Sequence, residues 1–118
     1  MQNTNDPGRR ILKGLSLNPS TPVERIALFV EDIDVTVLLA IGPDTGSDNF
    51  ISALPDRIKQ IRTLRQGILI FVDGAINKKN IAEVAKMCPD VIVTGSAVFD
   101  GKNATGNLKF MLDAIKKR

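Results

Sequence analysis

The chain has 118 residues, 43% of them apolar and 25% charged, a balance typical of one soluble globular domain. Its formal charge of +3 comes without Trp or Tyr, so the basic stripe with stacking aromatics that marks nucleic-acid binding is absent from the sequence. No apolar run reaches membrane-span length, and residues 1–10 are polar without a signal-peptide core. We therefore expect a cytoplasmic protein that binds neither nucleic acid nor membrane. The sequence contains no histidine, so histidine is excluded as a general base or metal ligand of this chain.

The elements predicted along the chain alternate between strand and helix. In chain order they are a flexible segment 1–10, strand 11–17, helix 22–31, strand 34–41, helix 50–66, strand 68–72, a helix capped by Asn77 and running to about residue 87, strand 91–93 and a helix from about 105. Thr21 followed by Pro22 is typical of a helix start. The apolar spacing is clearest in the second and last of the helices, which we expect to bury Ile51, Leu54, Ile58, Ile61 and Leu64, and Leu108, Met111, Leu112 and Ile115.

Strands joined by helical crossovers lie parallel, so the alternation predicts an α/β fold with a parallel sheet over residues 11–118. In such sheets the functional groups lie in the loops that follow the strands. The polar, glycine-bearing segments of this sequence fall at those places, namely 18–21, 42–49, 73–77 and 95–106. The sequence therefore predicts that the site lies at the carboxyl edge of the sheet.

Asp73 follows a buried strand and precedes Gly74, a position suited to proton transfer or metal binding. Alternatively, Asp73 accepts only backbone hydrogen bonds within the turn, as Asp before Gly often does. Gly74, and the pair Gly95 and Ser96, follow consecutive strands and could cradle a phosphate with their amides, or could serve only as turn formers. Cys88, the single cysteine, has no internal disulfide partner and is expected to be a small packing residue.

Three segments of the sequence together resemble one enzyme family. Residues 15–22, Leu-Ser-Leu-Asn-Pro-Ser-Thr-Pro, are similar to the L-x-L-N-P-x-T-P segment at the fifth strand of ribulose-phosphate 3-epimerases. Residues 71–77 resemble the V-D-G-G-I-N segment of the seventh strand, and residues 93–99 resemble the phosphate-binding segment of the eighth. The resemblance implies four β/α units of a TIM (β/α)8 barrel of the ribulose-phosphate-binding type, its C-terminal half.

That resemblance further implies a metal-dependent C3 epimerisation of a ketose phosphate, ribulose 5-phosphate to xylulose 5-phosphate. Asp73 would be one of two acid/base aspartates and also a ligand of a divalent metal, zinc by resemblance. Gly74, Gly95 and Ser96 would hold the phosphate of the substrate.

The chain also departs from the family pattern. The second aspartate and two histidine ligands belong to earlier strands that this sequence lacks, and only Pro43, Gly46 and Phe50 match the sixth-strand segment. Ala75 replaces the second glycine of the seventh-strand segment. We therefore expect a homo-oligomer, or a complementing half-barrel chain, to complete an epimerase site. The alternative is a half-barrel that binds a sugar phosphate without catalysis, or that has only a structural role.

Overall fold

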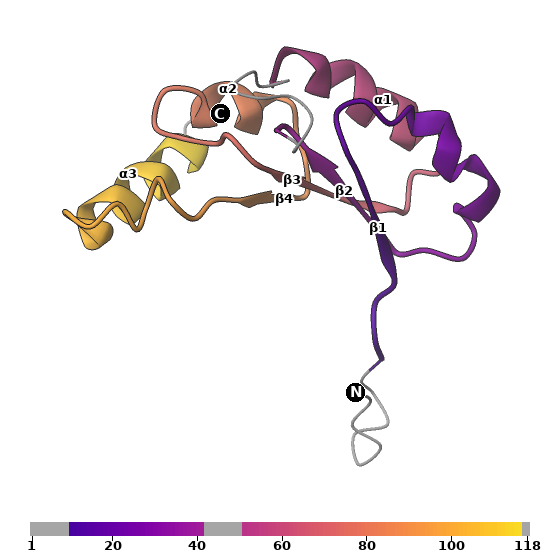
Figure 1. Ribbon diagram of the computed structural model, residues 1–118, viewed down its shortest axis with the longest axis horizontal. Helices are drawn as coiled ribbons and strands as arrows, with labels where there is room; N and C mark the ends of the chain where they lie inside the picture. The colour runs from indigo at the N-terminus through magenta and orange to yellow at the C-terminus, as the bar shows by residue number, and fades with distance from the viewer. Residues whose placement is uncertain (1–9, 42–50, 117–118) are drawn as a thin grey trace.

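The computed structural model describes residues 10–41 and 51–116 of the chain. One parallel sheet has the strand order β1-β2-β3-β4, with strands β1 (Gly14–Leu17), β2 (Val35–Leu39), β3 (Leu69–Asp73) and β4 (Val91–Val93). The helices are η1 (Val23–Phe29), η2 (Ile51–Ala53), α1 (Leu54–Leu64), α2 (Ile81–Lys86) and α3 (Ala104–Lys116). Figure 1 shows the helices along one side of the sheet, and the described residues place no helix on the other side. The predicted parallel α/β fold is confirmed.

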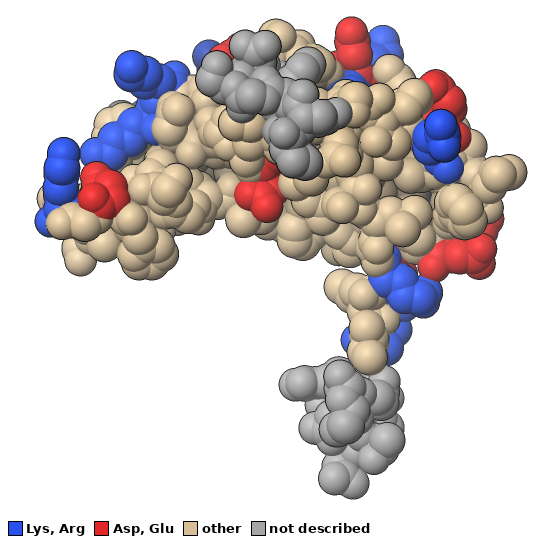
Figure 2. Space-filling view, viewed as in Figure 1, with Lys and Arg blue, Asp and Glu red and all other residues tan. Residues whose placement is uncertain are grey.

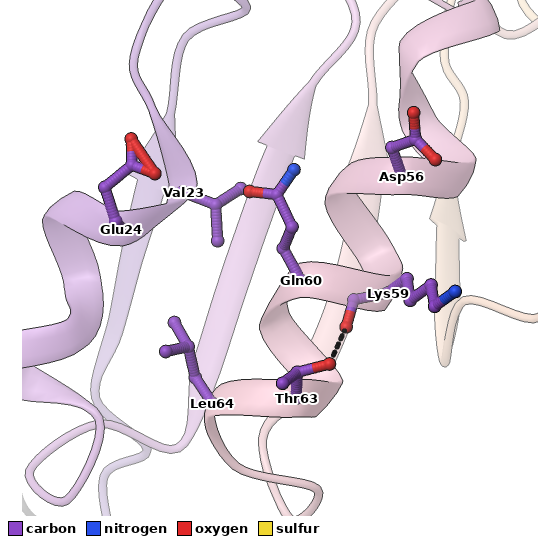
Figure 3. Close-up of a pocket in the computed structure, with 7 residues that line it drawn as sticks. All are labelled: Val23, Glu24, Asp56, Lys59, Gln60, Thr63 and Leu64. Carbon is purple, nitrogen blue, oxygen red and sulfur yellow. Dashed lines mark hydrogen bonds between the residues drawn. The ribbon is translucent and has the colours of Figure 1, made fainter.

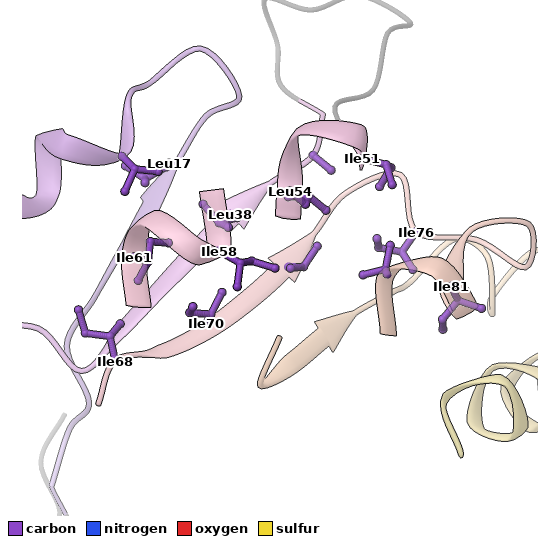
Figure 4. Close-up of a cluster of buried hydrophobic side chains, with 14 of the residues drawn as sticks. Leu17, Leu38, Ile51, Leu54, Ile58, Ile61, Ile68, Ile70, Ile76 and Ile81 are labelled. Carbon is purple, nitrogen blue, oxygen red and sulfur yellow. The ribbon is translucent and has the colours of Figure 1, made fainter. Parts of the chain in front are cut away.

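The core lies between the sheet and its helices. The register places Leu17, Leu38 and Val72 in one row facing the helices, and all three are buried. From α1, Leu54, Ile58 and Ile61 pack onto this row, as Figure 4 shows for the labelled side chains. The stripe at spacings of three and four residues therefore fixes how α1 lies on the sheet.

The opposite face of the sheet is also apolar, but it is only partly covered. Strand side chains alternate between faces, so this face carries the rows that include Phe71 and Val91, and Asp73 and Val93. Val91 and Val93 are 36% and 37% exposed, and Leu69 on the same face is 40% exposed. Such exposure of large apolar side chains on a central sheet face is not found when a β/α barrel is closed around it.

Two aspartates at the amino edge tie neighbouring strands together in the same way. Asp34, just before β2, donates its amide to Lys13 O and accepts the Lys13 amide with its carboxylate at 2.9 Å. Asp90, just before β4, donates its amide to Ile70 O and accepts the Ile70 amide at 2.8 Å. The Lys13 amide holds the pKa of the Asp34 carboxyl below its ordinary value, with Arg10 adding to the effect.

Several predicted elements differ in detail from the observed ones. The helix predicted over 22–31 is a 3₁₀ helix over Val23–Phe29, whose three-residue turn places the buried Val23 and Ile26 on one side. The first strand begins at Gly14 rather than at residue 11, because its ladder with β2 starts there. The side chain of Asn77, the predicted cap, accepts the amides of Lys79 and Asn80, but regular helix α2 begins only at Ile81, after a turn of residues 78–80.

The expected apolar stripe of the last helix is only half buried. Met111 is 2% exposed and Ile115 is packed against the core, but Leu108 and Leu112 are 47% and 48% exposed. Leu64, at the end of α1, is also 37% exposed. Part of the helical layer therefore presents apolar side chains that this chain does not cover.

The predicted segment 1–10, apart from Arg10, and the predicted loop 42–49 lie outside the described residues. No helix within the described ranges has the length and apolarity needed to span a membrane.

Candidate functional site

The loops that follow β3 and β4 meet at the carboxyl edge of the sheet and line one depression of about 440 Å³. Its lining consists of two runs of the chain, residues 73–77 and residues 93–97. All four residues that the sequence predicted for the site, Asp73, Gly74, Gly95 and Ser96, belong to this lining. The structure thus brings together two segments that lie about twenty residues apart in the sequence.

Asp73 is the last residue of β3 and stands in the row with Leu39 and Val93, on the face without helices. Its backbone oxygen accepts the Ala40 amide at 2.8 Å, which anchors the end of β3 to β2. The residue is half-buried, and among the described residues none donates a hydrogen bond to its carboxylate. The Asp73 carboxylate therefore accepts no hydrogen bond within the turn among the described residues, and it is available to bind a ligand at the sheet edge.

The loop after Asp73 has an unusual backbone, because Gly74 and Ala75 both have positive φ, 96° and 64°. A Cβ on Gly74 would lie 2.9 Å from Ile41 Cγ2 and 3.2 Å from Ile41 N, so only glycine fits. Asn80 donates its side-chain amide to Ala75 O at 2.8 Å, and it also accepts the Asn77 amide at 2.8 Å. Asn77 in turn accepts the Asn80 amide at 3.2 Å, so this reciprocal pair holds the loop in its strained conformation.

The loop after β4 has a different character. Gly95 O accepts the amides of Val98 and Phe99, both at 2.9 Å, which folds the segment into a turn. A Cβ on Gly95 would have no heavy atom within 4 Å, so the residue faces open space. No acceptor within the described part of the chain receives the amides of Gly95 or Ser96. Two amides at the rim of a depression are suited to bind phosphate oxygens.

A side-chain hydrogen bond joins the two loops. Thr94 Oγ1 donates to Ile76 O at 3.3 Å, so the residue before Gly95 is tied to the residue after Ala75. Sequence reasoning missed both Thr94 and Asn80 as supporting residues. A threonine or asparagine in a loop gives no signal of its partner, because the bond joins segments far apart in sequence.

Sequence reasoning also missed Arg57, which fixes the loop between β1 and η1 from the outside. From α1 its guanidinium donates to Pro19 O at 3.1 Å, Asn18 O at 3.2 Å and Thr21 O at 2.9 Å. Burial lowers the pKa of Arg57. Through this clamp the Asn18–Thr21 turn is held at the same edge of the sheet as the depression.

A second depression, of about 400 Å³, lies between η1 and α1 in the helical layer. Figure 3 shows side chains of Val23, Glu24 and Gln60 around it, and the Thr63 hydroxyl donates to the Lys59 carbonyl at 2.9 Å. It contains none of the predicted site residues and lies away from the strand ends that a β/α fold uses for chemistry. We therefore do not assign the site to it.

The described residues do not build a metal centre by themselves. Nowhere in the described residues do three or more His, Cys, Asp or Glu side chains gather closely enough to hold a metal ion. Asp73 is a single carboxylate, whereas a catalytic zinc site uses about three protein ligands. The prediction that Cys88 is a packing residue is wrong: Cys88 is exposed, with φ of 60° at the end of α2, where the chain turns out of the helix.

Fold and site together define a class: four consecutive β/α units of a barrel, in which the loops after β3 and β4 line one depression at the carboxyl edge of the sheet. The chain belongs to the ribulose-phosphate 3-epimerase family, whose model matches residues 3–99. The family resemblance predicted from three sequence segments is thereby confirmed.

Curated relatives show the same relationship. The chain is 33% identical over 107 residues to ribulose-phosphate 3-epimerase of Buchnera aphidicola subsp. Baizongia pistaciae, covering 87% of this chain and 47% of that protein. It is 37% identical over 90 residues to ribulose-phosphate 3-epimerase of Serratia marcescens, and the match covers 73% of this chain and 43% of that protein. The chain thus spans about half the length of the curated relatives that it matches.

Solved structures share the fold. The chain superposes on 3-hexulose-6-phosphate synthase from Salmonella typhimurium with a TM-score of 0.66 at 17% identity, covering 88% of this chain and 49% of that one. Thiamine phosphate pyrophosphorylase from Bacteroides thetaiotaomicron superposes with a TM-score of 0.53 at 14% identity, and the match covers 98% of this chain and 55% of that one. At these identities the likeness establishes the barrel-type fold alone.

Proposed function

We propose that this chain supplies the proton-transfer and phosphate-binding half of a ribulose-phosphate 3-epimerase site. The reaction is the C3 epimerisation of a ketose phosphate, ribulose 5-phosphate to xylulose 5-phosphate, in the cytoplasm. One observation carries the proposal: the half-buried Asp73 lines one depression together with Gly95 and Ser96. Family membership supports the reaction class, and this geometry supports the choice of residues.

Asp73 suits the first half of an epimerisation. The C3 hydrogen of the substrate is acidified by the neighbouring C2 ketone, so a positioned carboxylate can remove it and leave an enediolate. The carboxylate of Asp73 then holds the proton while the carbon becomes planar. Inversion requires a second acid on the opposite face of that carbon, and no other carboxylate among the described residues lines this depression. The proposal therefore needs a group from outside the described residues.

The phosphate has its own place in this arrangement. Gly95 and Ser96 line the depression, their amides have no protein acceptor among the described residues, and a dianion would satisfy both. Gly74 contributes by letting the β3–α2 loop pass close to Ile41, which leaves the space above the strand ends open. A bound phosphate fixes the sugar chain so that C3 faces one carboxylate only.

A divalent metal, zinc by resemblance, enters the proposal only for a completed site. Asp73 would be one of its ligands, and the remaining ligands must come from another set of strands, because the described residues hold no cluster for it. When bound, such a metal would supply electrostatic stabilisation of the negative charge that develops on the substrate oxygens as the C3 proton leaves.

The test is proton NMR of ribulose 5-phosphate in D₂O with the purified chain, in parallel with and without added Zn²⁺ or Mn²⁺. The proposal predicts loss of the C3 proton signal with the wild-type chain, and no loss with Asp73→Asn. Asp56→Asn is the matched control, because Asp56 is an exposed carboxylate on α1 and should not alter the exchange rate. Exchange that persists in Asp73→Asn would remove Asp73 from the proposed role.

A second candidate, a half-barrel that binds a sugar phosphate without catalysis, is favoured by the single carboxylate that the described residues place in the depression. It predicts that ribulose 5-phosphate raises the melting temperature of wild type and Asp73→Asn alike, with no C3 exchange in either. The two functions therefore separate on exchange, while binding alone is common to both.

A further inference from the structure

We propose that two copies of this chain close one eight-stranded barrel, in which β4 of each copy pairs in parallel with β1 of the other. The described residues of one copy leave three kinds of surface uncovered: one sheet face, two sheet edges and one side of α3. The face and the side of α3 are apolar, the edges carry unpaired backbone groups, and a two-fold assembly covers all three at once.

The uncovered sheet face forms the hollow side of the molecule. In Figure 2 the molecule is curved, and few charged side chains lie along its concave lower side. Leu69, Val91 and Val93 on this face are between 36% and 40% exposed. In a closed β/α barrel the same face is the filled interior, packed from both sides. In a single copy these apolar side chains are exposed to water, which favours association of this face with another apolar surface.

The two edges of the sheet also lack partners in the described chain, since β1 and β4 are its outermost strands. Next to the β1 edge, Ile11 and Leu12 are 57% and 50% exposed. Figure 1 shows this part of the chain running on from β1 away from the helices. An unpaired parallel edge flanked by exposed apolar side chains is a template for another strand.

Helix α3 shows on which side the missing strand lies. Helix α1 follows β2 and covers β2 and β3 together, as the packing of Ile58 and Ile61 shows (Figure 4). By the same geometry α3, which follows β4, covers β4 and the strand beyond it. In the described chain that strand is absent, and Leu108 and Leu112 remain about half exposed. Strand β1 of the partner fills that place.

A second copy fits the geometry because four strands are half of a closed barrel. Eight parallel strands close a β/α barrel, and two copies related by a two-fold axis supply eight and leave no free edge. The exposed aliphatic side chains on the face, edges and α3 present roughly 500 Å² of apolar surface per copy, comparable with the apolar part of a standard ~800 Å² interface half. These side chains are Ile11, Leu12, Leu15, Leu69, Val91, Val93, Leu108 and Leu112.

The barrel geometry also fixes the register of the new strand pair. The observed register runs from Ser16 through Val37 and Phe71 to Val91. A barrel with a shear of eight steps back by about four residues toward the amino end in half a turn. Val91 therefore pairs with the partner's Leu12, which has the same strand parity as Ser16 and the same inward direction.

The assembly has a consequence for the site, and this step rests on the proposed function. Strand β3 and its copy lie four strands apart and face each other across the barrel. Asp73 and Asp73 of the partner subunit then project into one cavity from opposite walls. A substrate held there has a carboxylate on each face, which is what an inversion requires and what the described residues of one copy do not supply.

The experiment is site-directed cross-linking, with sedimentation velocity on the same samples. In a Cys88→Ser background, the double variant Leu12→Cys with Val91→Cys should form a disulfide-linked dimer on mild oxidation. Within one chain the two positions lie at opposite edges, three strand spacings or roughly 14 Å apart, too far for an internal disulfide. Lys13→Cys with Val91→Cys is the matched control, because its two side chains point to opposite faces and should cross-link far less.

Sedimentation should show a species of twice the 12.8 kDa chain mass for the wild type. Val93→Lys should shift the protein toward monomer, whereas Leu28→Lys, at an 87% exposed position on η1, should leave the dimer intact. A folded 12.8 kDa monomer at micromolar concentration, or cross-linking no greater than in the control pair, would overturn the proposal. Neither readout uses catalysis, so a confirmed dimer without C3 exchange would refute the proposed function alone.

Discussion

Two glycines of the site give a matched pair of substitutions with opposite expected outcomes. Gly74→Ala places a methyl group where the backbone has φ of 96° and where Ile41 approaches to 2.9 Å at Cγ2 and 3.2 Å at N. Gly95→Ala places the same methyl group in open space, with no heavy atom within 4 Å. Both glycines line the same depression, so differences between the variants report local backbone geometry.

The magnitude for Gly74→Ala follows from two costs and one gain. A left-handed conformation costs an alanine about 1–2 kcal/mol, and displacing Ile41 adds about 1–3 kcal/mol because its backbone nitrogen, as well as its flexible side chain, must move. The more restricted unfolded chain returns about 0.4–1 kcal/mol. The net destabilisation is about 1–5 kcal/mol, with a central value of about 3 kcal/mol, whereas Gly95→Ala should change the free energy of unfolding by about 0.5 kcal/mol or less.

Urea denaturation followed by circular dichroism, at one fixed protein concentration, measures both variants against the wild type. With a mid-range m-value of about 2 kcal/mol/M, the central value for Gly74→Ala corresponds to an unfolding midpoint lowered by about 1.5 M, and Gly95→Ala should hardly move the midpoint. Equal midpoints for the two variants would refute the positive φ of Gly74 and its close approach to Ile41. Ribulose 5-phosphate binding can then be compared in Gly95→Ala, whose fold should be intact.

Two further predictions concern stability. Thr36 is fully buried on β2 and its hydroxyl has no hydrogen-bond partner among the described residues, so Thr36→Val should stabilise the fold by about 1–2 kcal/mol in urea denaturation. The control Thr63→Val, on the exposed face of α1, should be nearly neutral. No gain in Thr36→Val would mean that the Thr36 hydroxyl has a hydrogen-bond partner. Because the Lys13 amide lowers the pKa of Asp34 in the folded state, the carboxylate stabilises the fold above its unfolded pKa of about 4 and loses this contribution as pH falls through the lower folded pKa. Asp34→Asn should therefore lower the melting temperature at pH 7, and the difference from wild type should shrink below about pH 4; a difference that is constant with pH would contradict this coupling of Asp34 ionisation to folding.

Much of the fold could be predicted because short apolar runs and helical spacing are local signals. Strand 91–93 was predicted with the observed bounds, and the buried stripe of α1 was predicted from Ile58 and Ile61 among others. The 3₁₀ form of η1 was not predicted, since Val23 and Ile26 at a spacing of three suit both helix types. The exposure of Leu108 was not predicted either, because a sequence pattern shows which side of a helix is apolar but not whether a neighbour covers it.

The sequence predicted where the candidate site lies, but not the hydrogen bonds that hold its loops in place. Asp73, Gly74, Gly95 and Ser96 line one depression as expected, because the carboxyl ends of neighbouring parallel strands converge. Their roles in catalysis and phosphate binding stay predictions. The supports from Asn80, Thr94 and Arg57 arise from contacts across loops, which depend on tertiary structure and leave no mark in local spacing.

Binding of a sugar phosphate by the loops after β3 and β4 is best tested by amide NMR. The wild-type chain labelled with ¹⁵N would be titrated with ribulose 5-phosphate, and separately with inorganic phosphate. We expect saturable shifts of the Gly74, Gly95 and Ser96 amides with both ligands, and of the Asp73 amide with the sugar phosphate. Shifts confined to the η1 and α1 surface around Glu24, or no saturable shift at millimolar ligand, would contradict the proposed site.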